Sequence, residues 1–207
     1  MSAFRRRLMA MQKKDSIDWD YEWSYLSGEM PNDERFIKNI NGGEMTDMGM
    51  KFVGYNEEVV LFDKNKFHLY VKFVCDFPNY KGPSSPIIKG FSIVAHSDIM
   101  ETPEICFSEN NKGETTNNAI WWLGGRPHYL VDTKMTYDYN VDNVAILKYD
   151  LNAEYTVNGT INGEQIKVLQ SGGKQMWYRN KTRLGSKELS EGNAVYLKEL
   201  KIKVYDS

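Results

Sequence analysis

The sequence predicts an all-β protein, an antiparallel sandwich or barrel that follows a short basic arm. Apolar and polar residues alternate in many short runs, the pattern of strands with one face on a core and one in water. Glycine, asparagine and proline separate these runs and are typical of turns. Beyond the first residues, no segment has a convincing helical period. Many short strands joined by such turns favour a sandwich or a barrel.

The amino-terminal residues 1–14 differ from the rest of the chain. Five positive charges and no negative one lie here: Arg5, Arg6, Arg7, Lys13 and Lys14. Phe4, Leu8 and Met11 fall at positions i, i+4 and i+7, one apolar stripe of a short helix. Such a short helix is marginal alone in water. The segment is either a frayed tail or an arm that docks on an acidic partner surface. We assign residues 1–17 to the arm and 18–207 to one β domain.

The next stretch alternates strictly between aromatic and acidic residues. One face would carry Trp19, Tyr21, Trp23 and Tyr25, and the other Asp18, Asp20 and Glu22. We favour the interpretation that the acidic face is the solvated side of an edge strand. Carboxylates at this spacing could also bind calcium or act as the acid and nucleophile of a glycosidase.

Further strands are expected at regular intervals along the chain. Residues 27–41 are loop-like, and a hairpin is plausible around Gly54-Tyr55-Asn56. Phe67 to Cys75 is the cleanest alternating run, with His68, Tyr70 and Lys72 between core residues. Polar or turn-rich loops then separate shorter runs, which include residues 91–95, 105–107, 120–123 and 176–178.

The region from Val144 to Val168 predicts two strands with a tight turn and then a third. Asn158-Gly159 and Asn162-Gly163 both supply residues that accept the positive φ of two-residue hairpin turns. The last strand covers residues 196–205, where Leu200, Ile202 and Val204 alternate with lysines. An antiparallel sheet therefore lies at the centre of the domain.

Size and composition limit the function classes. The 207 residues fit one large β domain or, as an alternative, two small ones. A balance of 26 basic and 28 acidic residues gives a net charge of -2, which argues against broad nucleic-acid binding. Cys75 and Cys106 stand in apolar runs and are expected to be buried free thiols. No run approaches the roughly 20 apolar residues of a membrane span, and no secretory signal is recognisable.

Several runs resemble a known family. Phe67 to Phe73, the pair Val144 to Tyr149 and Tyr155 to Gly159, and Tyr196 to Tyr205 resemble strands of concanavalin A-like (laminin-G-like) jelly rolls. The resemblance implies an antiparallel two-sheet jelly-roll sandwich. It also admits a calcium ion, for which Asp63, Asp138 and Asp142 are the candidates, although no cofactor is required.

The amino terminus has a resemblance of its own. Phe4 to Met9 followed by Ile17 to Tyr21 is similar to the opening of virion proteins of tailed phages that infect gut Bacteroidales. This implies that Phe4, Arg5, Arg6, Arg7, Leu8 and Met11 dock on a capsid or fibre component. The protein would then reside in the virion, and in the host cytoplasm before assembly. Exposed aromatic residues also suggest self-association into a homo-oligomer.

No catalytic residues are predicted. Retaining glycosidases of this fold carry a Glu-x-Asp-x-x-Glu motif, and the sequence has no such spacing. His68, His96 and His128 are accompanied by neither a nucleophile elbow nor metal-ligand spacing. Each is expected to be a surface or hydrogen-bonded histidine.

Glycan binding is a further hypothesis, because sugars stack on aromatic rings and need oriented polar groups, and the sequence supplies both. The candidate residues are Trp121, Trp122, Tyr137, Asp138, Tyr139, Asn140 and Trp177. The alternative is that the tryptophans are buried or at an interface. We therefore expect a phage virion structural protein that presents a lectin-like domain for assembly contacts or glycan adhesion, without enzymatic turnover. A glycoside hydrolase and a free-standing glycan-binding module are the alternatives.

Overall fold

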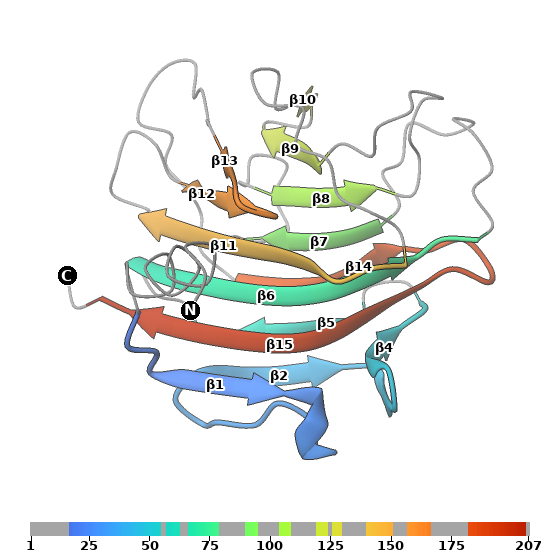
Figure 1. The fold of residues 1–207 in the computed structure, drawn as a ribbon, viewed down its shortest axis with the longest axis horizontal. Coiled ribbons are helices and arrows are strands. Elements are labelled where there is room, and N and C mark those ends of the chain that lie inside the picture. Colours follow the sequence, from blue (N-terminus) through green and yellow to red (C-terminus); the bar gives the residue numbers. More distant parts are fainter. Residues whose placement is uncertain are drawn as a thin grey trace, which may run out of the picture.

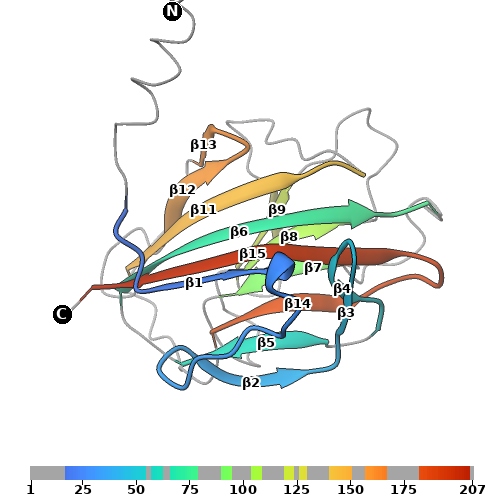
Figure 2. The ribbon, with the colours of Figure 1, turned by 60° about the horizontal axis from the view of Figure 1, so that its bottom comes forward.

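The structure of the chain, a computed structural model, describes residues 17–54, 57–62, 66–78, 90–94, 104–108, 119–123, 126–129, 140–150, 157–166 and 182–205. Within this part the chain forms β-strands and one short 3-10 turn, η1 (Tyr25–Ser27). The strands build two antiparallel sheets that stack face to face (Figure 1, Figure 2). The prediction of an antiparallel two-sheet sandwich is confirmed.

Sheet A is the layer nearer the viewer in Figure 1. Its strands, in spatial order, are β13 (Glu164–Ile166), β12 (Val157–Ile161), β11 (Asn143–Asp150), β6 (Lys66–Asp76), β15 (Ala194–Val204), β4 (Gly49–Phe52) and β3 (Glu44–Thr46). Strand β1 (Tyr21–Ser24) also pairs with β15. The first and last described strands are therefore neighbours.

Sheet B lies behind sheet A. Its order is β10 (Arg126–Tyr129), β9 (Ala119–Leu123), β8 (Glu104–Ser108), β7 (Gly90–Val94), β14 (Thr182–Glu188), β5 (Glu58–Leu61) and β2 (Ile37–Asn41). Figure 2 shows the two layers one above the other.

The core lies between the sheets and is organised around β6. Leu69, Val71 and Phe73 alternate along this strand and are fully buried. The Phe73 ring lies 4.5 Å from that of Phe107 and 4.9 Å from that of Phe91, both on sheet B. Burial of each such ring contributes about 2–3 kcal/mol, so this aromatic contact is a major link between the layers. The predicted core strand is confirmed.

The two Asn-Gly pairs have different roles. Asn162 (φ 50°) and Gly163 (φ 83°) form the tight turn between β12 and β13, as predicted. Asn158-Gly159 lies inside β12 instead, so the turn predicted there is wrong. A Cβ at Gly159 would lie 2.0 Å from the carbonyl oxygen of Ile146 on β11. This glycine is needed because the neighbouring backbone is too close for a side chain.

Two further predictions about local structure are wrong. Strands β4 and β5 flank Gly54 but belong to different sheets, so these two strands do not pair as the predicted hairpin requires. Residues 37–41, expected to be loop, form strand β2 at the edge of sheet B. Short turn signals show where the chain bends, but they do not show which sheet receives the next strand.

The aromatic side chains of the first strand are divided between the two faces of sheet A. Trp23 is buried in the core and Tyr21 packs against it, as predicted. Trp19 precedes the strand and contacts Tyr70 instead, at 6.2 Å between ring centroids. Tyr70 alternates with the core residues of β6 and so lies on the outer face. The prediction that Trp19 shares a face with Tyr21 and Trp23 is therefore wrong.

Cys75 is buried and forms no disulfide within the described residues, as expected. Residues 1–16 lie outside the described part, so the division into arm and domain stays a prediction. No helix in the described part is long and apolar enough to span a membrane.

Candidate functional site

Most of the predicted site residues lie where the structure gives no side-chain description. The six arm residues Phe4, Arg5, Arg6, Arg7, Leu8 and Met11 fall outside the described residues, as do Tyr137, Asp138, Tyr139 and Trp177. Trp121 and Trp122 belong to β9, where they pair with Ile105 and Glu104. Asn140 is exposed just before β11. The described members of the glycan set are thus divided between sheet B and sheet A, and the set stays a prediction.

The described part offers a different candidate, the outer face of sheet A. Three rows of side chains run across β15, β6 and β11, and two of them continue onto β12, because paired residues of antiparallel strands face the same way. The His68 row is Lys203, His68, Lys148 and Asn158, the Tyr70 row is Lys201, Tyr70, Ile146 and Thr160, and the Lys72 row is Glu199, Lys72 and Val144. Sequence reasoning placed His68, Tyr70 and Lys72 on this face but gave them no role.

The acidic side of β1 meets lysines of β15. Asp20 accepts a hydrogen bond from Lys203 Nζ at 2.8 Å and another from the backbone N–H of Val204 at 2.8 Å. Glu22 pairs with Lys201, which lies 179 positions away in the sequence. The complementary alternation of acids in the first strand and lysines in the last was the sequence signal for this pairing.

Within the glycosidase interpretation of Asp18, Asp20 and Glu22, the contacts of Asp20 oppose its role as the proton donor. The hydrogen bond from Lys203, with that from Val204, holds the pKa of Asp20 below its ordinary value. A catalytic acid needs a raised pKa so that it carries a proton near neutral pH. Asp20 is fixed in the opposite state. The solvated edge strand that the sequence favoured agrees with this geometry, and the pairing of its acidic residues with lysines is an additional finding.

A β-bulge in β15 builds a four-residue charge cluster at the far end of this face. The register shifts between Leu197 and Glu199, so one extra residue, Lys198, is accommodated. Lys198 Nζ lies 2.7 Å from Asp142, and Lys72 Nζ lies 3.1 Å from Asp142 and 3.4 Å from Glu199. The hydrogen bond from Lys198, then that from Lys72, lowers the pKa of Asp142. The cluster ties the segment before β11 to the sheet.

A metal ion has little support at Asp142, because two ammonium groups already occupy its carboxylate. Within the described residues, no group of three or more His, Cys, Asp or Glu side chains is arranged to hold a metal ion. Asp63 and Asp138 lie outside that part of the chain. A calcium site there stays a prediction.

Two aromatic contacts fix the centre of the face. The Tyr205 hydroxyl and His68 Nδ1 are 2.9 Å apart, and their rings meet edge to face with centroids 5.0 Å apart. Burial, and then the charge of Lys148, lower the pKa of His68. Tyr70 is contacted by the Trp19 ring, and Lys201 Nζ lies 5.4 Å from its ring centroid. Both rings are half-buried and therefore preorganised.

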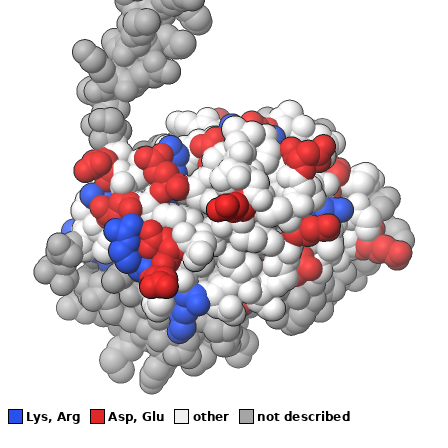
Figure 3. Space-filling view, turned by 90° about the horizontal axis from the view of Figure 1, so that it is seen from below, with Lys and Arg blue, Asp and Glu red and all other residues white. Residues whose placement is uncertain are grey.

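Charged side chains cover the adjoining edge of the sandwich unevenly. Figure 3, seen from below the view of Figure 1, shows acidic and basic groups toward both ends and a largely uncharged area between them, with one acidic group in it. The pair Asp33 and Arg35, 2.8 Å apart, belongs to the loop before β2. Interspersed charges of both signs on exposed edge strands discourage edge-to-edge aggregation.

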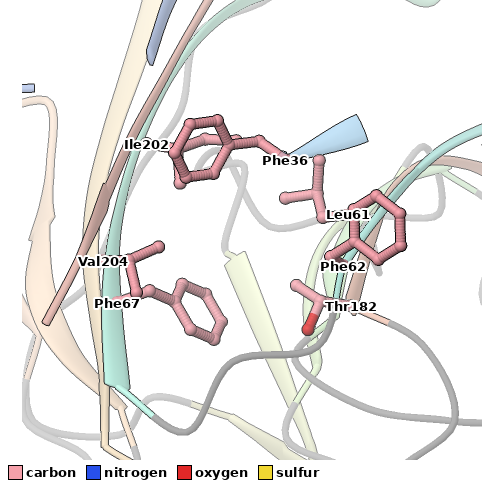
Figure 4. A pocket seen from close by; sticks show the side chains of 7 residues that line it. All are labelled: Phe36, Leu61, Phe62, Phe67, Thr182, Ile202 and Val204. Carbon is pink, nitrogen blue, oxygen red and sulfur yellow. The ribbon is translucent and has the colours of Figure 1, made fainter. Parts of the chain in front are cut away.

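An apolar notch opens between the sheets at one end of the sandwich. Phe36, Leu61, Phe62, Phe67, Thr182, Ile202 and Val204 line it, and their side chains point toward a common space (Figure 4). Its empty volume of about 230 Å³ includes open solvent. Thr182 supplies the single hydroxyl group among these lining side chains. The notch therefore lacks the several convergent polar groups that orient a sugar.

No protein family and no curated sequence matches this chain. Solved structures do match it. The Emp47p carbohydrate recognition domain is 12% identical with a TM-score of 0.51, covering 90% of this chain and 96% of that one. The metal-free Emp46p carbohydrate recognition domain is 10% identical with a TM-score of 0.53, covering 90% and 98%. The botulinum neurotoxin type G receptor binding domain is 14% identical with a TM-score of 0.52, covering 92% and 49%. At these identities the likeness establishes a lectin-like β-sandwich fold.

Proposed function

We propose that this chain is a lectin-like binding protein that recognises glycans without chemical turnover. The observation that carries the proposal is the outer face of sheet A, where half-buried aromatic rings stand among fixed hydrogen-bonding groups. Tyr70 offers part of a ring for the C–H face of a sugar, while Thr160 and Asn158 offer hydroxyl and amide groups for its hydroxyls. These residues lie on β6 and β12, which β11 joins within one sheet, and strands position side chains more rigidly than loops would.

Binding without turnover is favoured by the state of the acidic residues. Asp20 is held as a carboxylate by Lys203 and Val204, and Glu22 is engaged by Lys201. Such residues orient lysines and stabilise the edge strand. Asp20, held as a carboxylate, does not supply the proton that glycosidic bond cleavage requires.

We further propose that the protein acts as a structural component of a phage virion. The support is the resemblance of Phe4 to Met9 and Ile17 to Tyr21 to phage virion proteins, together with the basic composition of residues 1–14. The arm would dock on a capsid or fibre protein, and the sandwich would face outward. Deletion of residues 1–14 should leave the thermal unfolding of the sandwich unchanged and abolish incorporation into particles. Incorporation at the normal level would contradict the virion proposal.

A glycan array, followed by titration of the glycans that bind, tests the binding function. Tyr70→Ala should lose most binding, because the ring platform is removed. Trp121→Ala and Trp122→Ala are the matched variants at the site predicted from the sequence, and they should bind as the unaltered protein does. The opposite outcome would move the binding site to sheet B. Release of reducing ends from a bound glycan, abolished by Glu22→Gln, would contradict binding without turnover.

A further inference from the structure

The His68 row brings three basic side chains and an amide together on one face. Lys203 of β15 is paired with His68 of β6, which is paired with Lys148 of β11, and Asn158 of β12 follows. Directly opposed residues of antiparallel strands have Cβ atoms about 5 Å apart. The four side chains therefore form a continuous strip about 15 Å long, without a carboxylate among them.

The charges along this strip are only partly compensated. Lys203 is neutralised by Asp20 at 2.8 Å. Lys148 makes no ion pair within the part of the chain that the structure describes, and its charge acts on His68. The hydrogen bond between His68 Nδ1 and Tyr205 fixes the imidazole and leaves its Nε2 directed elsewhere. The strip thus has two groups, Lys148 and His68, available to an anion.

The adjacent Tyr70 row has a complementary chemistry. Tyr70, Ile146 and Thr160 provide an aromatic ring, an aliphatic surface and a hydroxyl group in register. Two residues along a strand span about 7 Å, so the Tyr70 row and the His68 row are separated by a distance that one sugar ring can bridge. A ring placed over Tyr70 and Ile146 would direct an acidic substituent toward Lys148.

We propose that the outer face of sheet A binds anionic sugars, with the ring on Tyr70 and Ile146 and the acidic group between Lys148 and His68. This inference rests on the proposed glycan-binding function and names the substrate class. A sugar fits better than an acidic peptide, because the row beside the cationic strip is aromatic, aliphatic and hydroxylic. Carboxylate and sulfate groups share the chemistry that the strip recognises, so the test distinguishes uronic-acid from sulfated sugars.

The test is calorimetric titration of the full chain with four probes. These are a galacturonic acid hexasaccharide, its methyl ester, a sulfated hexasaccharide and polyglutamate. Lys148→Gln should weaken hexauronate binding about tenfold, the value of one charge-assisted hydrogen bond, and leave binding of the methyl ester unchanged. Lys38→Gln removes the same charge from β2 in sheet B and should change affinity less than twofold.

A pH series adds a readout specific to His68. The groups that face it are Lys203 of β15, Lys148 of β11, Tyr205 and, through Lys203, Asp20. A bound carboxylate favours the protonated imidazole, so hexauronate should bind more tightly at pH 5.5 than at pH 8. His68→Gln should remove this pH dependence and leave a folded protein, because Gln retains an acceptor for Tyr205.

Each outcome bears on the inference. Tighter binding of hexauronate or of the sulfated sugar than of the ester, lost in Lys148→Gln, supports it and identifies the acidic group. Binding of the methyl ester alone refutes the inference and leaves the proposed glycan-binding function intact. Equal binding of polyglutamate refutes it in favour of an acidic protein partner. Binding of none of these probes and of no glycan on the array refutes both proposals.

Discussion

Replacing Asp20 by alanine tests whether the carboxylate has a structural role at the edge of sheet A. Its side chain, 32% exposed, accepts hydrogen bonds from Lys203 Nζ and from the backbone N–H of Val204. A hydrogen bond to a charged group contributes about 1.5–3 kcal/mol when buried, and an exposed ion pair about 0.2–1 kcal/mol. With partial exposure, which weakens both contacts, we expect Asp20→Ala to lower the free energy of unfolding by about 2 kcal/mol.

Two variants separate the contribution of the Asp20 charge from that of its hydrogen bond to Val204 and from that of the neighbouring Glu22. Asp20→Asn keeps an acceptor for Val204 but loses the charge, and we expect a loss of about 1 kcal/mol. Glu22→Ala removes a carboxylate that is 55% exposed and bonds only to Lys201 in the described part. This variant should therefore lower the free energy of unfolding by only about 0.5 kcal/mol. Urea unfolding at pH 7 measures all three. A loss of 2 kcal/mol moves the midpoint by about 1 M.

The direction of the pKa shift of Asp20 determines how its contribution to stability changes with pH. The pKa of Asp20 is lower in the folded protein than its ordinary value of 3.8, first because of Lys203 and then Val204. Its contribution to stability is therefore complete above pH 3.8 and is lost as the pH falls through the lower folded pKa. The difference between the unaltered protein and Asp20→Ala should shrink in that acidic range. An equal difference at pH 7 and at pH 2.5, or no difference at pH 7, would refute the reasoning.

Two more predictions test the packing. Gly159→Ala places a Cβ against the carbonyl oxygen of Ile146 and should lower the free energy of unfolding by at least about 2 kcal/mol. Gly163→Ala, where a Cβ would have nothing within 4 Å, should lower it by only about 1 kcal/mol. Equal urea midpoints of the two variants would contradict the close approach of Gly159 to Ile146. Phe73→Ala should cost about 3–5 kcal/mol, because a fully buried ring between two others is lost. Phe62→Ala, at a side chain that is 40% exposed, is its control in the same measurement.

The sequence predicts those parts of the fold whose signal is local. Strand β6 follows from the alternation of Phe67 to Cys75, and the turn at Asn162-Gly163 follows from residues that accept positive φ. Asn158-Gly159 has the same local signal but lies within β12, because the decisive fact is the nearness of Ile146 on the paired strand. That fact depends on register, which the dipeptide does not contain.

The candidate face was less accessible to sequence reasoning, because its rows are assembled from strands far apart in the chain. Glu22 meets Lys201 only because β1 pairs with β15, and His68 meets Lys148 only because β6 pairs with β11. Alternation correctly placed His68 outside the core. It does not show which strands adjoin His68. The sequence indicates Trp121 and Trp122 instead, because tryptophan is itself a signal of sugar binding.

The most direct test of the binding surface is a backbone amide NMR titration of the isotope-labelled chain with a glycan selected on the array. If the outer face of sheet A binds sugars, the shifted amides will gather on β6, β11 and β12 around Tyr70 and His68. Shifts gathered on β9, around Trp121 and Trp122, would contradict this account.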